Sequence, residues 1–163
     1  METEKMGELY QQIAEGINEI IPSEWAKVIL YAEILDDSSE VFFYFNPPQS
    51  EDYIYSHNIP EHFQVSEYLY DDLLIKLQDA FEELRKEYKE NNLHIWTNLT
   101  LNLDRTGQFS IDYNYEDVIG SELNGAQRKA VWVYKNLGLM PKRKTVRTFL
   151  EDFIKTSERK MKS

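Results

Sequence analysis

The chain has 163 residues, of which 42% are hydrophobic and 13% aromatic, and its formal net charge is −11. This apolar content is too high for an intrinsically disordered protein, and we expect one domain over residues 1–163 with a substantial core. The chain contains no cysteine, which excludes disulfide bonds, thiolate metal ligands and a thiol nucleophile.

The first half of the chain predicts a helix followed by a β-hairpin. Residues 3–21 form an amphipathic helix that ends at Pro22, because apolar side chains recur at steps of three and four residues: Leu9, Ile13, Ile17, Ile20 and Ile21. Residues 25–35 and 41–45 have the alternation and aromatic content of β-strands, separated by a polar turn. The proline-containing region 46–65 is predicted to be irregular, with a further strand possible at Tyr53-Ile54-Tyr55.

A long helix is predicted from Ser66, as its N-cap, to about residue 90. One stripe of apolar side chains supports it: Tyr70, Leu73, Leu74, Leu77, Phe81, Leu84 and Tyr88. A second hairpin follows, in which residues 99–103 and 109–115 alternate between apolar and polar side chains. Gly107 lies where a three-residue hairpin turn requires a left-handed conformation.

Two further helices are predicted to close the chain, over residues 122–137 and 145–160. The first stops at Gly138. Two consecutive hairpins, with helices before, between and after them, predict an α+β fold with an antiparallel sheet of about four strands. We expect one face of this sheet to be hydrated, because its outward positions carry polar residues: Lys27, Glu33, Glu40, Asp112 and Asn114.

Charge is distributed unevenly along the sequence. Residues 1–120 contain 25 acidic and 7 basic residues, whereas residues 121–163 contain 4 acidic and 11 basic residues. An acidic body repels nucleic acid and anionic membranes and attracts basic proteins. The basic helical segment from about residue 142 is expected to pack on this body or to stay loosely attached, and nucleic-acid binding by it is disfavoured.

The sequence gives no sign of a leader or a membrane span. The N-terminus lacks the basic and apolar regions of a secretory signal, and no run reaches the roughly 18 apolar residues of a membrane helix. The absence of cysteine fits a reducing compartment. We therefore expect a cytoplasmic protein.

Motifs for catalysis or cofactor binding are absent from the sequence. His57, His62 and His94 lack the spacing of metal ligands, and no nucleophile elbow or glycine-rich nucleotide loop occurs. Adjacent carboxylates such as Asp71-Asp72 are expected to be solvated and therefore unsuited to acid–base catalysis. We predict no catalytic residue, no cofactor and no metal site.

Recognition by surface charge is better supported than catalysis. An inhibitor needs carboxylates that meet Lys and Arg of its target around a few aromatic anchors. The loop between Phe45 and Val65 and the end of the second hairpin both offer this mixture, and the predicted partner-binding residues are Glu51, Asp52, Tyr53, Tyr55, Asp112, Glu116 and Asp117. The alternative is that the tyrosines belong to the core and the carboxylates only keep its rim hydrated.

Several short segments resemble a known family. They are Trp25-x-Lys27 with Tyr31-Ala32-Glu33, Phe42-Phe43-Tyr44-Phe45, Trp96-Thr97, Gly107-x-Phe109-x-Ile111-x-Tyr113, and Trp132-x-Tyr134-Lys135-x-Leu137-Gly138-x-x-Pro141. Over about residues 5–141 the chain resembles the YezG-like immunity protein family, which includes EsaG-type antitoxins of staphylococci. The resemblance does not extend past Pro141 and assigns no role to the basic segment.

This resemblance implies a non-enzymatic immunity protein. It would bind the C-terminal nuclease domain of an LXG-type toxin that a type VII secretion system exports, and its acidic surface would take the place of nucleic-acid phosphates. The toxin, the stoichiometry and the oligomeric state stay open. Two alternatives are an orphan or adaptor-type protein-binding domain without a nuclease target, and an enzyme of unknown class in which a histidine meets carboxylates in a pocket.

Overall fold

The computed structural model describes residues 3–162, and the chain divides into two compact units, Met1–Glu116 and Asp117–Ser163. The first unit contains, in chain order, α1 (Glu4–Ile20), β1 (Lys27–Ile34), β2 (Ser39–Asn46), β3 (Ile54–Tyr55), the 3-10 helix η1 (Ser56–Asn58), α2 (Ile59–Phe63), α3 (Glu67–Glu90), β4 (Asn98–Asp104) and β5 (Phe109–Asn114). The second contains α4 (Gly125–Leu137) and α5 (Lys144–Lys162). The predicted α+β class is confirmed, and the single domain over 1–163 stays a prediction.

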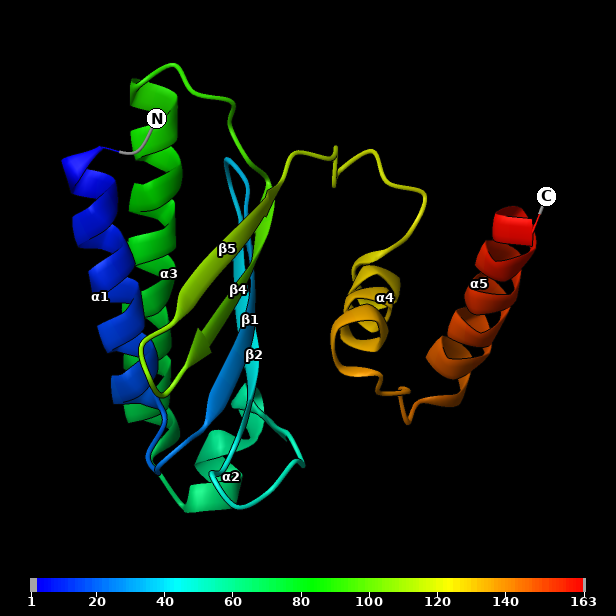
Figure 1. The fold of residues 1–163 in the computed structure, drawn as a ribbon, viewed down its shortest axis with the longest axis horizontal. Coiled ribbons are helices and arrows are strands. Elements are labelled where there is room, and N and C mark those ends of the chain that lie inside the picture. The colour runs from blue at the N-terminus through cyan, green and yellow to red at the C-terminus, as the bar shows by residue number, and fades with distance from the viewer. Residues whose placement is uncertain (1–2, 163) are drawn as a thin grey trace. The chain divides into compact units, whose positions relative to one another are not determined.

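The first unit is a five-stranded antiparallel sheet with a helical layer on one face. The strand order is β3-β2-β1-β4-β5, so the two predicted hairpins pair through β1 and β4. Figure 1 shows α1 and α3 side by side along the sheet. The short run Tyr53-Ile54-Tyr55 does supply a further strand, β3, which pairs with β2 at one edge.

The core lies between the helical layer and the inner face of the sheet. Leu30 on β1 pairs with Phe43 on β2 and Leu101 on β4, and all three side chains are fully buried. Ile13 from α1 and Phe81 from α3 are fully buried in the same cluster. The alternation of each strand and the apolar stripe of each helix therefore meet in one hydrophobic cluster.

Caps explain where the helices begin and end. The side chains of Thr3 and Ser66 accept hydrogen bonds from Met6 N and Leu69 N, at 3.1 and 3.4 Å. In α4, Asn124 forms a capping box, so this helix begins at Gly125 and not at about residue 122 as predicted. The same helix ends as predicted at Gly138, whose φ of 70° is the left-handed conformation that glycine adopts without strain.

The outer face of the sheet differs from the prediction. It is polar on β4 and β5, but on β1, β2 and β3 it carries an aromatic cluster of Tyr31, Phe42, Tyr44 and Tyr55. The prediction that Glu33 is hydrated is wrong, since this residue is only 8% exposed. Its Oε1 instead accepts a 2.8 Å hydrogen bond from the Tyr31 hydroxyl, which lies two residues away on the same side of the strand.

Candidate protein-binding surfaces

The residues predicted to bind a partner lie at opposite edges of the sheet. Tyr55 is on the edge strand β3, and Asp112 is on the other edge strand, β5. Three strands separate these edges, so the two groups are about 19 Å apart at roughly 4.8 Å per strand. The structure therefore does not bring the seven residues together into one contact, and their role in binding stays a prediction.

The first group lies in the loop that joins β2 to β3. Glu51 and Asp52 are exposed, and Tyr53 is half-buried. The ring of Tyr55 lies 5.1 Å from that of Tyr44, measured between centroids. Burial raises the pKa of the Tyr55 hydroxyl above its ordinary value. Tyr55 is therefore part of the aromatic cluster of the sheet, and it offers a partner less surface than a free tyrosine would.

The second group lies at the end of β5 and just beyond it. Asp112 and Glu116 are exposed, and their carboxylates form no hydrogen bond or ion pair with the residues that the structure describes. Asp117 begins the second unit, and its Oδ1 accepts a 3.0 Å hydrogen bond from the Gly120 amide. The Asp117 side chain also occupies the space that a Cβ at residue 120 would need, so it has a structural task in this turn.

A third surface, which the sequence interpretation missed, lies on the first half of α3. The large apolar side chains of Tyr68, Leu69 and Ile75 are 78%, 51% and 53% exposed. Tyr115 is the other large apolar residue exposed in the described part of the first unit, and its ring stacks on His94 with centroids 4.1 Å apart. Isolated exposed apolar residues are ordinary, but Tyr68 and Ile75 lie two turns apart on the same side of one helix and so form a patch.

Carboxylates surround these apolar side chains. We use the name α3 patch for Tyr68, Asp71, Asp72, Ile75 and Asp79. Helical geometry places residues 68, 72, 75 and 79 in one row along the solvent side of the helix. The three aspartates are exposed, and none of them forms a hydrogen bond or ion pair within residues 3–162. The patch therefore combines accessible apolar surface with negative charge that the fold does not use.

A shallow groove runs beside the α3 patch, between α1 and α3. Its lining includes Gly16, Leu73 and Leu77, and a Cβ at position 16 would lie 3.2 Å from Leu77 Cδ1. Lys76 and Glu19 lie at the rim of this groove, with Nζ 3.9 Å from Oε2. Because both side chains are more than half exposed, this ion pair contributes little to stability.

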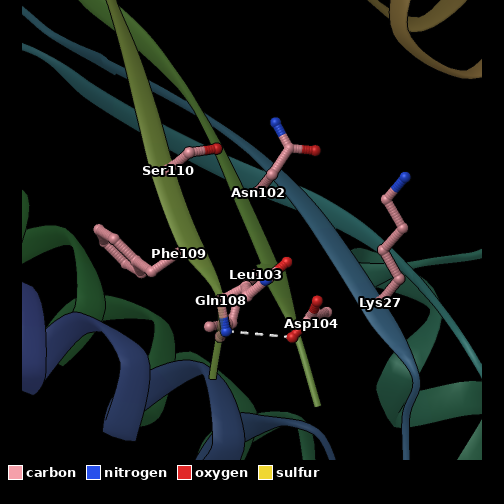
Figure 2. Close-up of a pocket in the computed structure, with 7 residues that line it drawn as sticks. All are labelled: Lys27, Asn102, Leu103, Asp104, Gln108, Phe109 and Ser110. Atoms are coloured by element: carbon pink, nitrogen blue, oxygen red, sulfur yellow. Dashed lines mark hydrogen bonds between the residues drawn. The ribbon is translucent and has the colours of Figure 1, made fainter. Parts of the chain in front are cut away.

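A hollow of the sheet lies at the end of the β4–β5 hairpin. Figure 2 shows Lys27, Asn102 and Ser110 on one side of the strands and Phe109 on the opposite side, toward the helices. Asp104 also lines it, but its Oδ1 accepts hydrogen bonds from Thr106 and Gln108. These bonds lower the pKa of the Asp104 carboxyl, which therefore stabilises the turn and is not suited to proton transfer.

The three histidines lie on the surface of the first unit. His57, His62 and His94 are exposed, and each contacts an aromatic ring. The Nδ1 atom of His57 lies 2.8 Å from the Tyr70 hydroxyl. Over the part of the chain that the structure describes, no three His, Asp or Glu side chains gather as metal ligands would.

No helix within residues 3–162 combines the length and the apolar character that crossing a bilayer requires. The second unit is basic, with 11 basic and 5 acidic residues, whereas the first has 24 acidic and 7 basic residues and a net charge of −17. The acidic side chains are thus gathered on the unit that contains the sheet.

The chain matches a known family model. Residues 6–151 match the model of a family described as immunity protein YezG-like. This match includes most of both units and continues beyond Pro141 into α5, so the expectation that the resemblance ends at Pro141 is wrong.

Three relatives are similar along most of their length. Immunity protein YezG of Bacillus spizizenii is 76% identical over 161 residues, which are 99% of this chain and 100% of the relative. Immunity protein YezG of Bacillus subtilis is 50% identical over 149 residues, 91% of this chain and 99% of the relative. Type VII secretion system protein EsaG of Staphylococcus aureus is 38% identical over 138 residues, 85% of each chain.

Proposed function

The chain belongs to the YezG-like immunity protein family, and from this premise we propose that it is an antitoxin that neutralises a protein toxin by binding it. The proposed target is the C-terminal nuclease domain of an LXG-type toxin exported by a type VII secretion system. The name of the staphylococcal relative, a type VII secretion system protein, supports the secretion route. Binding would take place in the cytoplasm of the producing cell, before export.

The observation that carries this proposal is the unpaired acidic surface of the first unit. Its net charge is −17, and the carboxylates of the α3 patch and of the β5 end have no cationic partner among the described residues. A nuclease domain presents Lys and Arg to the phosphates of its substrate. Exposed carboxylates offer an alternative set of anions to the same cations and speed the encounter between the two proteins.

We propose that inhibition requires no reaction catalysed by this chain. Each histidine is exposed beside an aromatic ring, and the carboxyl group of Asp104 is held by a turn. A binding protein needs neither a general base nor a nucleophile, only a stable surface complementary to its target. The five-stranded sheet with its buried core supplies a rigid support for such a surface.

The experiment pairs the purified protein with the C-terminal domains of candidate LXG toxins. DNA cleavage by each domain is measured at increasing ratios of protein to toxin, and each mixture is passed through a size-exclusion column. We expect one domain to lose activity at equimolar protein and to elute with it. The proposal fails if every domain cleaves DNA at an undiminished rate at low ionic strength, where attraction between opposite charges is strongest.

Three acidic surfaces compete as the place of contact: the β2–β3 loop, the end of β5 and the α3 patch. The seven residues chosen from the sequence belong to the first two. Reversing the charges of Asp112, Glu116 and Asp117 tests the second directly. Unchanged affinity for the toxin domain would exclude that surface and leave the proposed function intact.

A further inference from the structure

We propose that the α3 patch is the main docking site for the toxin, with Tyr68 and Ile75 as apolar anchors and Asp71, Asp72 and Asp79 as partners for Lys and Arg. The choice of the toxin as occupant rests on the proposed function. The location of the site rests on the structure alone, because it follows from exposure, spacing and unpaired charge on one helix.

The core does not need the anchors. The buried side of α3 is formed by Tyr70, Leu77, Phe81 and Leu84, and these residues alone satisfy the apolar stripe of the helix. Tyr68 and Ile75 lie on the opposite side, and they leave 78% and 53% of their surface to solvent. Burying such side chains in a partner would stabilise a complex at no expense to the fold.

The spacing of the patch suits a contact with two anchors. Residues 68 and 75 are two helical turns apart, about 10 Å along the axis at roughly 1.5 Å per residue. Asp72 lies between them in the same row, and Asp79 continues it. A guanidinium that pairs with Asp72 would also be near the Tyr68 ring, where cation–π attraction adds to the ion pair. A partner that matches this patch would have Lys or Arg side chains between two apolar pockets.

The sign of the charge selects the occupant. Nucleic acid and anionic lipid would be repelled by the three aspartates on a unit of net charge −17. A symmetric pair of this chain through the same face would bring together two units that each have a net charge of −17, and the repulsion between them is destabilising. A cationic protein surface satisfies both the anchors and the carboxylates, and a nuclease domain has such a surface.

The rival surface at the end of β5 has unpaired carboxylates but lacks a free apolar anchor. Asp112 and Glu116 are unpaired, but the large apolar residue beside them, Tyr115, already stacks on His94. Anchors buried in a partner dominate the affinity of most interfaces, whereas charges at a rim mainly change the association rate. The α3 patch offers both kinds of group on one helix.

Four variants separate the α3 patch from the end of β5. Y68A/I75A removes the anchors, and D71N/D72N/D79N removes the charges of the patch. D112N/E116Q/D117N removes three charges from the rival surface, and Asn at 117 keeps the oxygen that accepts from Gly120. E8Q/E24Q/D37N is the matched control, because it removes three exposed carboxylates that lie outside all three candidate surfaces. Alanine favours helix more than Tyr or Ile, so loss of α3 is not expected.

The readout is the dissociation constant for the toxin domain that the wild-type protein inhibits, measured at low and at high salt. We expect Y68A/I75A to weaken binding at least about tenfold at both salt concentrations. We expect D71N/D72N/D79N to weaken it severalfold at low salt and less at high salt. The control should stay within about twofold of wild type, a smaller change than loss of an anchor produces.

Failure of this inference and failure of the proposed function give different results. If the wild-type protein binds no toxin domain, the proposed function is wrong. If it binds and inhibits, but the two α3 variants bind as tightly as wild type, only the docking site is wrong. A larger loss of affinity with D112N/E116Q/D117N than with the α3 variants would place the site at the end of β5. If the protein alone has a molecular mass that rises with concentration, and Y68A/I75A abolishes this rise, a second copy of the chain occupies the patch.

Discussion

The two halves of α3 use their polar side chains in opposite ways. In the second half, Arg85 bridges to Asp36 at 3.0 Å, Glu82 accepts a hydrogen bond from Ser39, and Glu87 accepts one from Thr3. In the first half, taken as residues 67–79, the aspartates of the α3 patch bond to nothing that the structure describes. Both halves are rich in charge, but the charged contacts with the rest of the fold lie in the second half, apart from the exposed ion pair between Lys76 and Glu19. Unused charge beside exposed apolar surface is what distinguishes a docking face from an ordinary hydrated one.

The largest effect is expected on the buried side, which both halves share. Phe81 is fully buried in the core cluster, and replacing it with alanine should lower the free energy of unfolding by about 3–5 kcal/mol through lost burial and a cavity. Urea denaturation followed by circular dichroism measures this. Ile75→Ala, on the exposed side of the same helix, serves as the control and should change stability by less than about 1 kcal/mol. Equal losses would show that Ile75 is a core residue.

The next largest effect on stability is expected for Arg85, in the second half of α3. Arg85 donates from Nε to the Trp96 carbonyl at 3.2 Å and from Nη1 to Asp36. Arg85→Ala should cost about 1.5–3 kcal/mol, because hydrogen bonds to charged groups are lost and a carbonyl is left unpaired. The measurement is again urea denaturation. Binding to the toxin domain at a temperature where the variant is folded should be unchanged; a large loss of affinity would mean that the second half also contacts the partner.

A smaller effect is expected at the start of the first half. The Ser66 side chain caps α3 through the amide of Leu69, and replacement of such a cap with alanine costs about 1 kcal/mol. Ser66→Asp should retain the stability, since aspartate also caps and interacts favourably with the helix dipole. Thermal unfolding of the two variants provides the comparison. If Ser66→Ala is as stable as wild type, the first half does not depend on its cap.

Tyr70, on the buried side of the first half of α3, is expected to make the stability of the protein depend on pH. Burial raises the pKa of Tyr70 from 10.0 to about 12, and its hydroxyl lies 2.8 Å from His57 Nδ1. Because the pKa of Tyr70 is higher in the folded than in the unfolded protein, ionisation of this group leaves the free energy of unfolding unchanged below pH 10. The free energy of unfolding falls as the pH rises from 10 toward 12. Urea denaturation at pH 8 and at pH 11 should therefore show a smaller alkaline loss in Tyr70→Phe than in wild type. An equal loss would show that other tyrosines cause it.

The sequence predicted the elements because local patterns decide them. Residues only a few positions apart in sequence determine the apolar stripe of α3 and the alternation of β4 and β5. They also determine the turn in which Gly107 has a φ of 92°. The short helices η1 and α2 were not predicted, because Pro60 and the surrounding polar residues suggested an irregular loop. Glu33 was misplaced because strand alternation predicts the face on which a residue lies but not its burial, and only the structure shows that this side chain is 8% exposed and bonded to the Tyr31 hydroxyl.

The functional surface could not be predicted in the same way. Asp36 and Arg85 are 49 residues apart in sequence, and only the fold shows that this pair is used while Asp72 is unused. The signal for the α3 patch was nevertheless in the sequence, since Tyr68 and Ile75 fall outside the apolar stripe that predicted the helix. Apolar residues off the stripe of an amphipathic helix are candidates for contact with a partner.

The smallest expected effect is the most direct test of the contrast between the two halves. D71N/D72N/D79N should change the free energy of unfolding by no more than about 0.5 kcal/mol, as is usual for exposed substitutions. The reason is that the change removes no hydrogen bond or ion pair within the described residues, and the repulsion between exposed carboxylates that it relieves is weakened by the solvent. Salt weakens this repulsion further, so the difference from wild type should stay within that limit at low and at high ionic strength. A loss above about 1 kcal/mol would exceed the usual range for exposed positions, would show that the fold uses these aspartates, and would remove the distinction on which the docking site depends.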